Sequence, residues 1–195
     1  RDIERSVDKS MTSLLRHAAG IPMPATWAME SPAQAQRLVM RESAAGRALV
    51  LKPLFGSQGK GLQLVGSVDG VHHPLPDLKQ GYGGLAYLQR FVPPLTQPGF
   101  DWRVLVVGGR AVTAMRRVSA HWVHNVAQGA RCEPATFDAP LARLAEDAAR
   151  AVEMDVSLPE GSVTVIPNGV PPLDLDPPPR DIADPLVGVI ARFDP

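Results

Sequence analysis

The sequence predicts an α+β fold, in which helices and antiparallel strands are mixed along the chain. Three observations support this fold class. Apolar residues recur at helical spacing in three separate segments. A short apolar run over residues 48–52 leads into a glycine-rich loop, and a second strand-like run leaves that loop. Farther along, Gly108-Gly109 joins two strand-like segments as a hairpin turn.

Each expected helix has a signal at one of its ends. The first, around residues 11–18, is stopped by Gly20 and the proline that follows it. The second begins at Ser31, an N-cap with proline at the first helical position, and Gly46 closes it. The third starts at Asp138, and its apolar residues lie along one side.

Five segments are typical of strands, because apolar residues gather in them between turn residues. These strands are expected at residues 48–52, 62–65, 85–92, 104–107 and 111–117. The stretch 68–84 is rich in Gly, Pro and Asp, so we expect a loop there. We expect His72-His73, within this stretch, to lie in a solvated turn rather than in a metal site.

The composition limits the class of protein. With 195 residues, the chain suits one large domain or one and a half small ones. Lys+Arg and Asp+Glu number 20 each, so charge gives no case for binding to nucleic acid or an anionic membrane. The single cysteine, Cys132, excludes an internal disulfide and fits a reducing cytoplasm. No apolar run approaches the roughly 18 residues of a membrane span, and because the chain opens with Arg1 we expect an upstream part to be missing.

The glycine-rich loop carries the clearest chemical signal. Gly56, Gly59 and Gly61 leave backbone N–H groups uncovered and let the chain bend tightly. Such N–H groups hold an anion, and Lys52 and Lys60 add positive charge beside them. The loop is neither a Walker A sequence nor a clear dinucleotide fingerprint, and a plain hairpin is the simpler alternative. We interpret the loop as nucleotide-binding.

Over about residues 7–156 the sequence resembles the ATP-grasp superfamily and, within it, the RimK-type amino-acid ligases. The resemblance depends on an ordered set of short motifs, each weak alone. The set comprises Asp8-Lys9, Gly20-Ile21-Pro22-Met23-Pro24-Ala25-Thr26, Lys52 before Gly56-Ser57-Gln58-Gly59-Lys60-Gly61, Gln89-Arg90-Phe91-Val92, Asp101-Trp102-Arg103, and Asn125 before Gln128-Gly129-Ala130. The resemblance implies an ATP-grasp fold, in which two α+β subdomains sandwich ATP, incomplete here at both ends.

The resemblance also implies which residues bind the nucleotide. Lys9 and Lys52 belong to this set, and Lys52 would reach the α- or β-phosphate as a compact cation. Asp101 would accept a ribose hydroxyl. The flap over the phosphates would consist of Gly56, Ser57, Gln58, Gly59, Lys60 and Gly61, and the hinge that faces the adenine would consist of Gln89, Arg90, Phe91 and Val92.

Arg103 and Asn125 are the catalytic residues that the resemblance implies, since they would face the phosphates and the reacting carboxylate. Two plainer alternatives stay open from the residues alone. Asp101 and Arg103 would then form a surface pair worth under about 1 kcal/mol. Asn125 would then be a turn residue.

The implied activity is ATP-dependent carboxylate–amine ligation. A carboxylate attacks the γ-phosphorus to give an acylphosphate, and an amine then displaces phosphate to form an amide. Mg²⁺ and positive charge neutralise the transferring group. The expected partners are therefore ATP, a carboxylate and an amine, which is typically glutamate in RimK-type enzymes. A homo-oligomer is compatible with the sequence.

The chain departs from the family pattern at several positions. The family usually has an acidic residue where Arg90 stands and an arginine where Val123 stands. The Glu-x-Asn motif, which holds Mg²⁺ in the family, occurs nowhere in the sequence. We therefore assign no metal ligands and expect impaired turnover.

The tail, residues 157–195, is rich in proline, and we expect a boundary between it and an ATP-grasp domain over 1–156. Segments 163–170 and 186–195 resemble the start of the nucleotide-sugar domain of GT-B retaining glycosyltransferases, in which Arg192 would match a diphosphate contact. The alternative is a divergent end of the ATP-grasp domain. Three hypotheses remain: a ligase domain, a glycosyltransferase-related chimera, and a non-catalytic scaffold that keeps a nucleotide fold.

Overall fold

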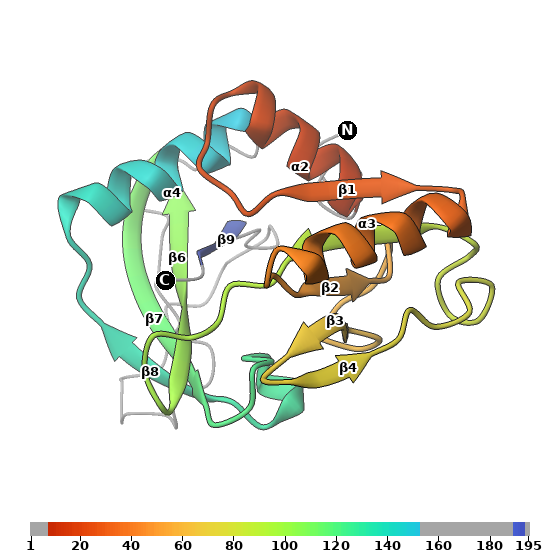
Figure 1. Cartoon of the computed structure of the whole chain (residues 1–195). Helices are drawn as coiled ribbons and strands as arrows, with labels where there is room; N and C mark the ends of the chain where they lie inside the picture. The colour runs from red at the N-terminus through yellow and green to blue at the C-terminus, as the bar shows by residue number, and fades with distance from the viewer. Residues whose placement is uncertain (1–7, 153–188, 194–195) are drawn as a thin grey trace. The chain divides into compact units, whose positions relative to one another are not determined.

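The computed structural model describes residues 8–152 and 189–193 (Figure 1). The chain forms two compact units, residues 1–93 and residues 94–195. Each unit has its own antiparallel sheet, and each is described by itself below. None of the helices in the described residues is long and apolar enough to cross a membrane.

The first unit is built on a five-stranded sheet in the order β1-β5-β2-β3-β4. All neighbouring strands in it are antiparallel. The strands are β1 (Thr26–Met29), β2 (Leu49–Lys52), β3 (Gln63–Val68), β4 (Val71–His73) and β5 (Ala86–Arg90). Strand β2 therefore lies in the middle of the sheet, and the loop that follows it leads to its neighbour β3.

Two helices belong to the first unit, and both lie where the sequence predicts a helix. Helix α2 (Lys9–Ala18) is capped by Asp8, whose carboxylate accepts hydrogen bonds from two backbone N–H groups of the first turn. Helix α3 (Pro32–Ala44) is capped by the Ser31 hydroxyl and has proline at its first position.

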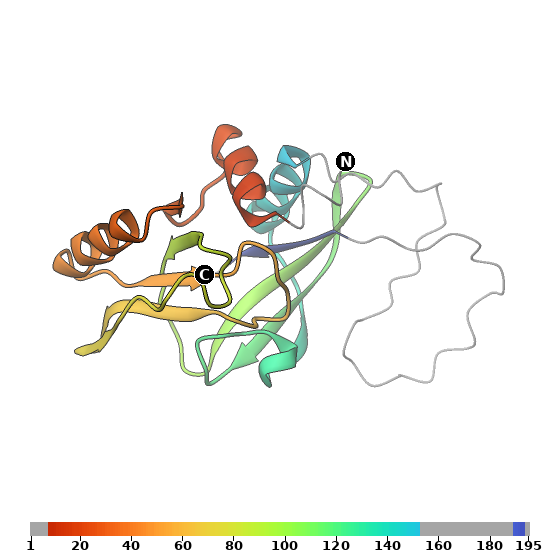
Figure 2. The ribbon, with the colours of Figure 1, turned by 90° about the vertical axis from the view of Figure 1, so that its right-hand side faces the viewer.

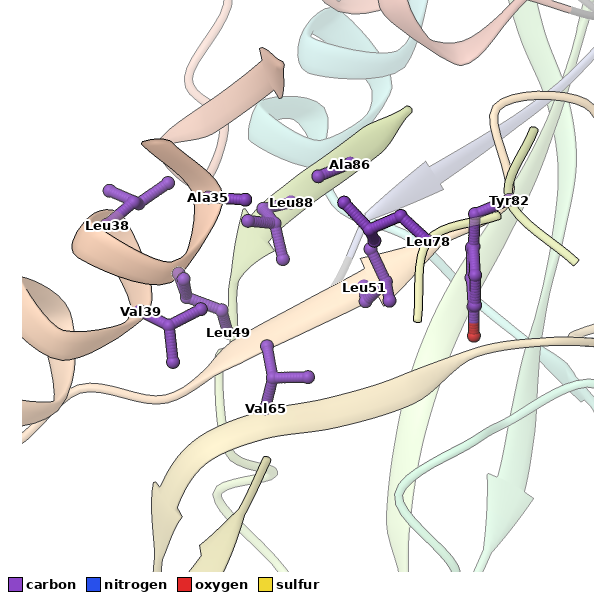
Figure 3. Close-up of a cluster of buried hydrophobic side chains, with 10 residues drawn as sticks. All are labelled: Ala35, Leu38, Val39, Leu49, Leu51, Val65, Leu78, Tyr82, Ala86 and Leu88. Atoms are coloured by element: carbon purple, nitrogen blue, oxygen red, sulfur yellow. The ribbon is translucent and has the colours of Figure 1, made fainter. Parts of the chain in front are cut away.

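The core of the first unit lies between α3 and one face of the sheet (Figure 3). Side chains alternate between the two faces of a strand, so Leu49 and Leu51 of β2 point toward α3 and are at most 1% exposed. The same face carries Val65 and Leu88 from the neighbouring strands. The remaining core residues are Ala35, Leu38, Val39, Leu78, Tyr82 and Ala86.

The second unit has a four-stranded antiparallel sheet in the order β8-β7-β6-β9. Its long strands β6 and β7 run side by side as a hairpin, seen along their length in Figure 2. Apolar residues of β6 and β7 pack against α4, with Val104, Val106, Ala114, Ala145 and Ala149 as the core. The elements are β6 (Gly99–Val107), β7 (Arg110–Ser119), η1 (Val126–Gln128), β8 (Arg131–Ala135), α4 (Ala139–Ala151) and β9 (Val189–Phe193).

The expected helices are confirmed, and so is the hairpin turn at Gly108-Gly109, where both residues have positive φ. The prediction of a loop over 68–84 is wrong in part, because strand β4 forms within this stretch. Asp69 and Gly70 adopt φ of 49° and 79° and make a two-residue turn between β3 and β4. His72-His73 therefore lies on a strand and not in a turn.

Strands β1 and β8 were not expected from the sequence. In the tail, β9 pairs antiparallel with β6. The segment 163–170 lies outside the described residues.

Candidate functional site

Lys52 is the last residue of β2 and lies on the sheet face opposite α3, because it alternates with the core residue Leu51. Its ammonium group donates a hydrogen bond to Oε1 of Gln89 on the neighbouring strand β5. The Gln89 amide in turn donates to the Thr26 hydroxyl over 3.1 Å. Thr26 donates to the Pro24 carbonyl over 2.8 Å, so a chain of hydrogen bonds fixes the amide that faces Lys52.

Lys9 lies in the first turn of α2 and reaches the glycine-rich loop. Its ammonium group donates to the carbonyl oxygens of Leu54 and Gly56, over 3.2 Å and 2.9 Å. Burial lowers the pKa of Lys9, although the nearby Asp8 carboxylate acts in the opposite direction. The sequence predicts Lys9 and the loop as parts of one site, and the structure brings them into direct contact.

The glycine-rich loop joins β2 to β3 and depends on glycine at its end. Gly59 and Gly61 have φ of 73° and 72°, in the region that side chains disfavour. A Cβ on Gly61 would also lie 2.7 Å from Cγ of Pro53. The Tyr82 hydroxyl donates to the Gly61 carbonyl over 2.9 Å and holds this end of the loop. The middle of the loop, around Ser57, is exposed.

Tyr87 and the polar side of α2 complete this face of the first unit, and the sequence analysis missed them. The Tyr87 hydroxyl donates to the Lys9 carbonyl over 3.2 Å and shares a hydrogen bond of 2.6 Å with the Ser13 hydroxyl. Burial raises the pKa of Tyr87 and lowers the pKa of Arg16. The signal was available, because Lys9, Ser13 and Arg16 recur at helical spacing on α2.

The predicted hinge begins at the end of β5, where the backbone is held on both sides. The N–H of Arg90 donates to the Ala25 carbonyl over 2.8 Å, and the N–H of Phe91 donates to the Ala48 carbonyl over 2.9 Å. Gln89 and Arg90 point to opposite faces of the sheet, so only Gln89 contacts Lys52. Val92 is exposed.

In the second unit, Asp101 is fully buried on β6, so the alternative of a surface pair with Arg103 is wrong. Instead, Arg117 of the facing strand β7 binds both carboxylate oxygens. Its Nε donates to Oδ1 over 2.7 Å, and its Nη2 donates to Oδ2. Arg117 was missed in the sequence analysis. The ribose contact predicted for Asp101 stays a prediction.

Arg103 shares its sheet face with this ion pair, because it lies two residues from Asp101 on β6. This face is the one opposite α4, since the alternate residues Trp102 and Val104 belong to the core cluster with α4. The structure thus places Asp101 and Arg103 on one face, as their spacing implies.

Asn125 immediately precedes the short helix η1, and its backbone carbonyl accepts hydrogen bonds from Gln128 and Ala130. The backbone of Asn125 therefore lies in a turn, as the plainer alternative from the sequence predicts. Its side chain takes no part in capping, however. The Oδ1 atom is buried and has no hydrogen-bond partner within the part of the chain that the structure describes. A buried carbonyl oxygen of this kind suits a ligand that donates a hydrogen bond.

Val123, two residues before Asn125, is 5% exposed and fills a buried position. No three His, Cys, Asp or Glu side chains among the described residues form a group that could hold a metal ion. We therefore assign no residues to Mg²⁺.

The sequence and the fold of this chain are similar to those of known proteins. The model of one protein family, the RimK-like ATP-grasp domain, matches residues 5–158. A tetrahydromethanopterin:alpha-L-glutamate ligase from Methanosarcina acetivorans is 34% identical over 165 residues, covering 77% of this chain and 48% of its own length. The protein of the same description from Methanococcus maripaludis is 33% identical over 165 residues, covering 82% and 55%. The chain thus spans about half the length of these relatives.

Solved structures show the same fold at lower sequence identity. The RimK domain protein ATP-grasp from Sphaerobacter thermophilus has a TM-score of 0.51 at 24% identity, covering 76% of this chain and 51% of that one. D-cycloserine synthetase DcsG has a TM-score of 0.53 at 19% identity, with coverage of 78% and 53%. The ATP-grasp ligase PsnB, solved with minimal precursor, Mg and ADP, has a TM-score of 0.53 at 17% identity and covers 76% and 43%. These likenesses confirm the expected fold class.

Proposed function

This chain belongs to the RimK-like ATP-grasp family, and on that premise we propose that it binds ATP for an ATP-dependent carboxylate–amine ligation. The observation that carries the proposal is the arrangement around Lys52 in the first unit. Lys52 binds Gln89 on the neighbouring strand, and Lys9 binds the glycine-rich loop that follows Lys52 in the chain.

Three features of the first unit support phosphate binding. Lys52 is placed on a central strand, where its position is fixed more firmly than on a loop. Lys9 supplies a second ammonium group beside the loop, and its partial burial disfavours the unbound cation, which an anion would stabilise. The loop supplies backbone N–H groups from residues whose φ values only glycine adopts readily.

In the second unit we propose that Arg103 and Asn125 face the reacting groups. The buried pair of Asp101 and Arg117 would hold β6 and β7 in register beside Arg103. The unpartnered Oδ1 of Asn125 would accept a hydrogen bond from the substrate amine.

The chemistry proceeds in two balanced steps. A substrate carboxylate oxygen bonds to the γ-phosphorus as the bond to the ADP oxygen breaks, giving an acylphosphate. The amine nitrogen then bonds to the acyl carbon, loses a proton, and phosphate leaves. Mg²⁺, when bound, would supply charge neutralisation for the phosphates. Lys52 and Arg103 would supply the positive charge that comes from this chain.

We propose glutamate as the amine, because the relatives are named as alpha-L-glutamate ligases. The activity of those whole proteins is a proposal for this chain, which spans about half their length. We further expect this chain by itself to turn ATP over slowly, and a cytoplasmic location stays a prediction of the sequence.

Replacing Lys52 by alanine tests the proposal. We expect Lys52→Ala to weaken ATP binding about tenfold to a hundredfold, because a charged hydrogen bond to phosphate is lost. Isothermal titration calorimetry with and without Mg²⁺ measures this effect. Lys79→Ala is the matched control, since Lys79 is an exposed lysine of the same unit.

Two results would contradict the proposal. If the unaltered chain gave no saturable signal at millimolar ATP, nucleotide binding would be excluded under these conditions. If Lys52→Ala and Lys79→Ala bound ATP equally well, the scaffold hypothesis would be favoured. Competition by nucleotide-sugars and not by ATP would favour the glycosyltransferase-related chimera.

A further inference from the structure

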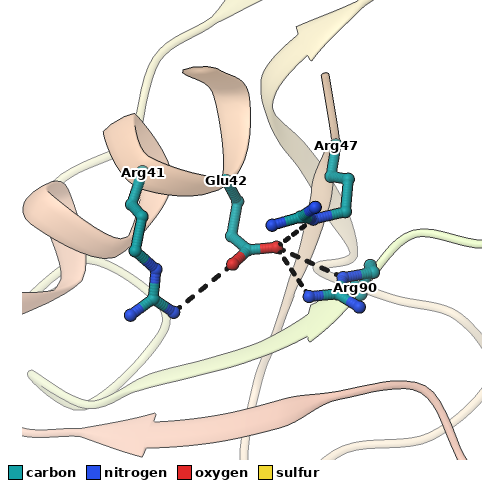
Figure 4. A network of polar contacts seen from close by, with 4 residues as sticks. All are labelled: Arg41, Glu42, Arg47 and Arg90. Atoms are coloured by element: carbon teal, nitrogen blue, oxygen red, sulfur yellow. Dashed lines mark hydrogen bonds and ion pairs between the residues drawn. The ribbon is translucent and has the colours of Figure 1, made fainter. Parts of the chain in front are cut away.

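Glu42 of α3 is a buried carboxylate surrounded by three arginines (Figure 4). Its side chain is 2% exposed. Arg47 donates from Nε to Oε2 over 2.8 Å, and Arg41 donates from Nη2 to Oε1 over 3.3 Å. Arg90 donates to Oε2 twice, from Nε over 3.2 Å and from Nη2 over 2.9 Å.

Two of the three arginines, Arg47 and Arg90, keep this carboxylate ionised. The hydrogen bond from Arg47 is the largest influence, and Arg90 adds a hydrogen bond and its charge. Together they lower the pKa of Glu42 to about 2, although burial acts in the opposite direction. Glu42 is therefore negatively charged at neutral pH, next to Arg90 at the end of β5.

Arg90 connects this cluster to the predicted hinge. It is the last residue of β5, and its side chain lies on the α3 face, whereas the preceding Gln89 points to the Lys52 face. The strand end is therefore held by side chains on both faces, by Glu42 on one and by Lys52 on the other.

Trp27 of β1 restricts Arg90 further. The Arg90 guanidinium carbon lies 6.0 Å from the centre of the Trp27 ring, and that of Arg41 lies 5.9 Å from it. A planar guanidinium with two hydrogen bonds to one carboxylate and an aromatic ring beside it has little freedom to change rotamer.

We propose that Glu42 is a positioning residue for nucleotide binding, which acts through Arg90 to fix the backbone of hinge residues 90–92. This inference depends on the proposed function, because it requires that the hinge faces the base of ATP. The family resemblance places an acidic residue where this chain has Arg90. In this chain the carboxylate is supplied from α3 and the arginine stands on the hinge.

The proposal predicts a split between two parts of the ligand. Lys9, Lys52 and the loop would bind the phosphates, whereas the hinge would bind the base. A less rigid hinge should therefore weaken the binding of ATP but not the binding of inorganic tripolyphosphate, which has no base. If Glu42 only stabilised the fold, replacing it would weaken the binding of both ligands to the same extent.

The experiment measures the dissociation constants of ATP and tripolyphosphate by calorimetry on the 195-residue chain and its variants. We expect Glu42→Gln and Arg90→Lys each to raise the dissociation constant of ATP about tenfold. The dissociation constant of tripolyphosphate should rise less than about twofold. The double variant should weaken ATP no more than either single change, because both changes remove the same interaction.

Arg41→Met is the matched control. Arg41 contacts the same carboxylate and the same tryptophan, but it lies on α3 and not on the hinge. It should leave the ratio of the two dissociation constants unchanged. If Glu42→Gln does not fold, as judged by circular dichroism, the ratio for Arg90→Lys decides alone, because that variant keeps a cation beside Glu42.

An unchanged ratio in Arg90→Lys, or an equal shift in Arg41→Met, would overturn the proposal. Failure of the unaltered chain to bind ATP would be a different result. In that case the proposed function would fall, and the hinge role with it. Binding of ATP by the unaltered chain and by all variants with equal affinity would remove only the role of Glu42.

Discussion

At the scale of single residues, Glu42 and Lys52 show how one sheet serves two purposes. Strand β2 buries Leu49 and Leu51 against α3 and turns Lys52 to the other face. On strand β5, Arg90 lies on the α3 face and Gln89 lies on the same face as Lys52. The two-residue alternation of a strand therefore separates the face proposed to bind the ligand from the face that packs against α3.

The pH dependence of stability follows from Glu42. Its folded pKa of about 2 lies below the ordinary value of 4.5, so its contribution is present above pH 4.5 and is lost as the pH falls toward 2. Chemical denaturation at pH 7 and pH 3 checks this. Between these two pH values the free energy of unfolding should fall by about 2 kcal/mol more in the unaltered chain than in Glu42→Gln. Parallel pH profiles for the two proteins would show that Glu42 has no such coupling.

At the scale of elements, the starts of α3 and α4 and the buried face of α4 were predictable, whereas the buried face of α2 was not. Ser31 and Asp138 cap α3 and α4 where the sequence predicts that these helices begin, and Asp8 caps α2. However, α2 turns its polar side toward the sheet, and its apolar Met11 and Leu14 are 42% and 61% exposed. Capping is decided by neighbours in the sequence, whereas a buried face is decided by what the helix meets.

The N-cap of α4 gives a prediction for one element. Asp138 accepts a hydrogen bond from the Leu141 N–H over 2.9 Å, so Asp138→Ala should destabilise the chain by about 1 kcal/mol. Asp147→Ala is the control, because its exposed pair with Arg150 should contribute less than about 0.5 kcal/mol. Urea denaturation compares them, and equal losses would show that the cap contributes no more than a surface pair.

At the scale of the whole molecule, the chain consists of two units, each with its own sheet and core. The residues proposed for phosphate binding lie in the first unit, and Arg103 and Asn125 lie in the second. ATP bound by the residues proposed in the first unit would stabilise that unit, because a ligand that binds only the folded state stabilises it.

Thermal unfolding tests this stabilisation. At a free ATP concentration of about 100 times the dissociation constant, ATP should stabilise the chain by about 2.7 kcal/mol. Differential scanning calorimetry should show an increase in Tm that is smaller in Lys52→Ala at the same ATP concentration. An increase of the same size in both proteins would place the bound nucleotide away from Lys52.

The sequence by itself determined the fold class, the helix starts, the Gly108-Gly109 turn and the family, because these depend on local chemistry and on the order of motifs. Only the tertiary structure decided the partners of Asp101, Glu42 and Arg90. The hairpin illustrates the reason. Counting outward from the turn would place Arg116 opposite Asp101, but an irregularity at Leu105 and Val106 shifts the register and brings Arg117 there instead. A shift of one residue moves a side chain to the other face of a sheet, and no pattern in the sequence marks it.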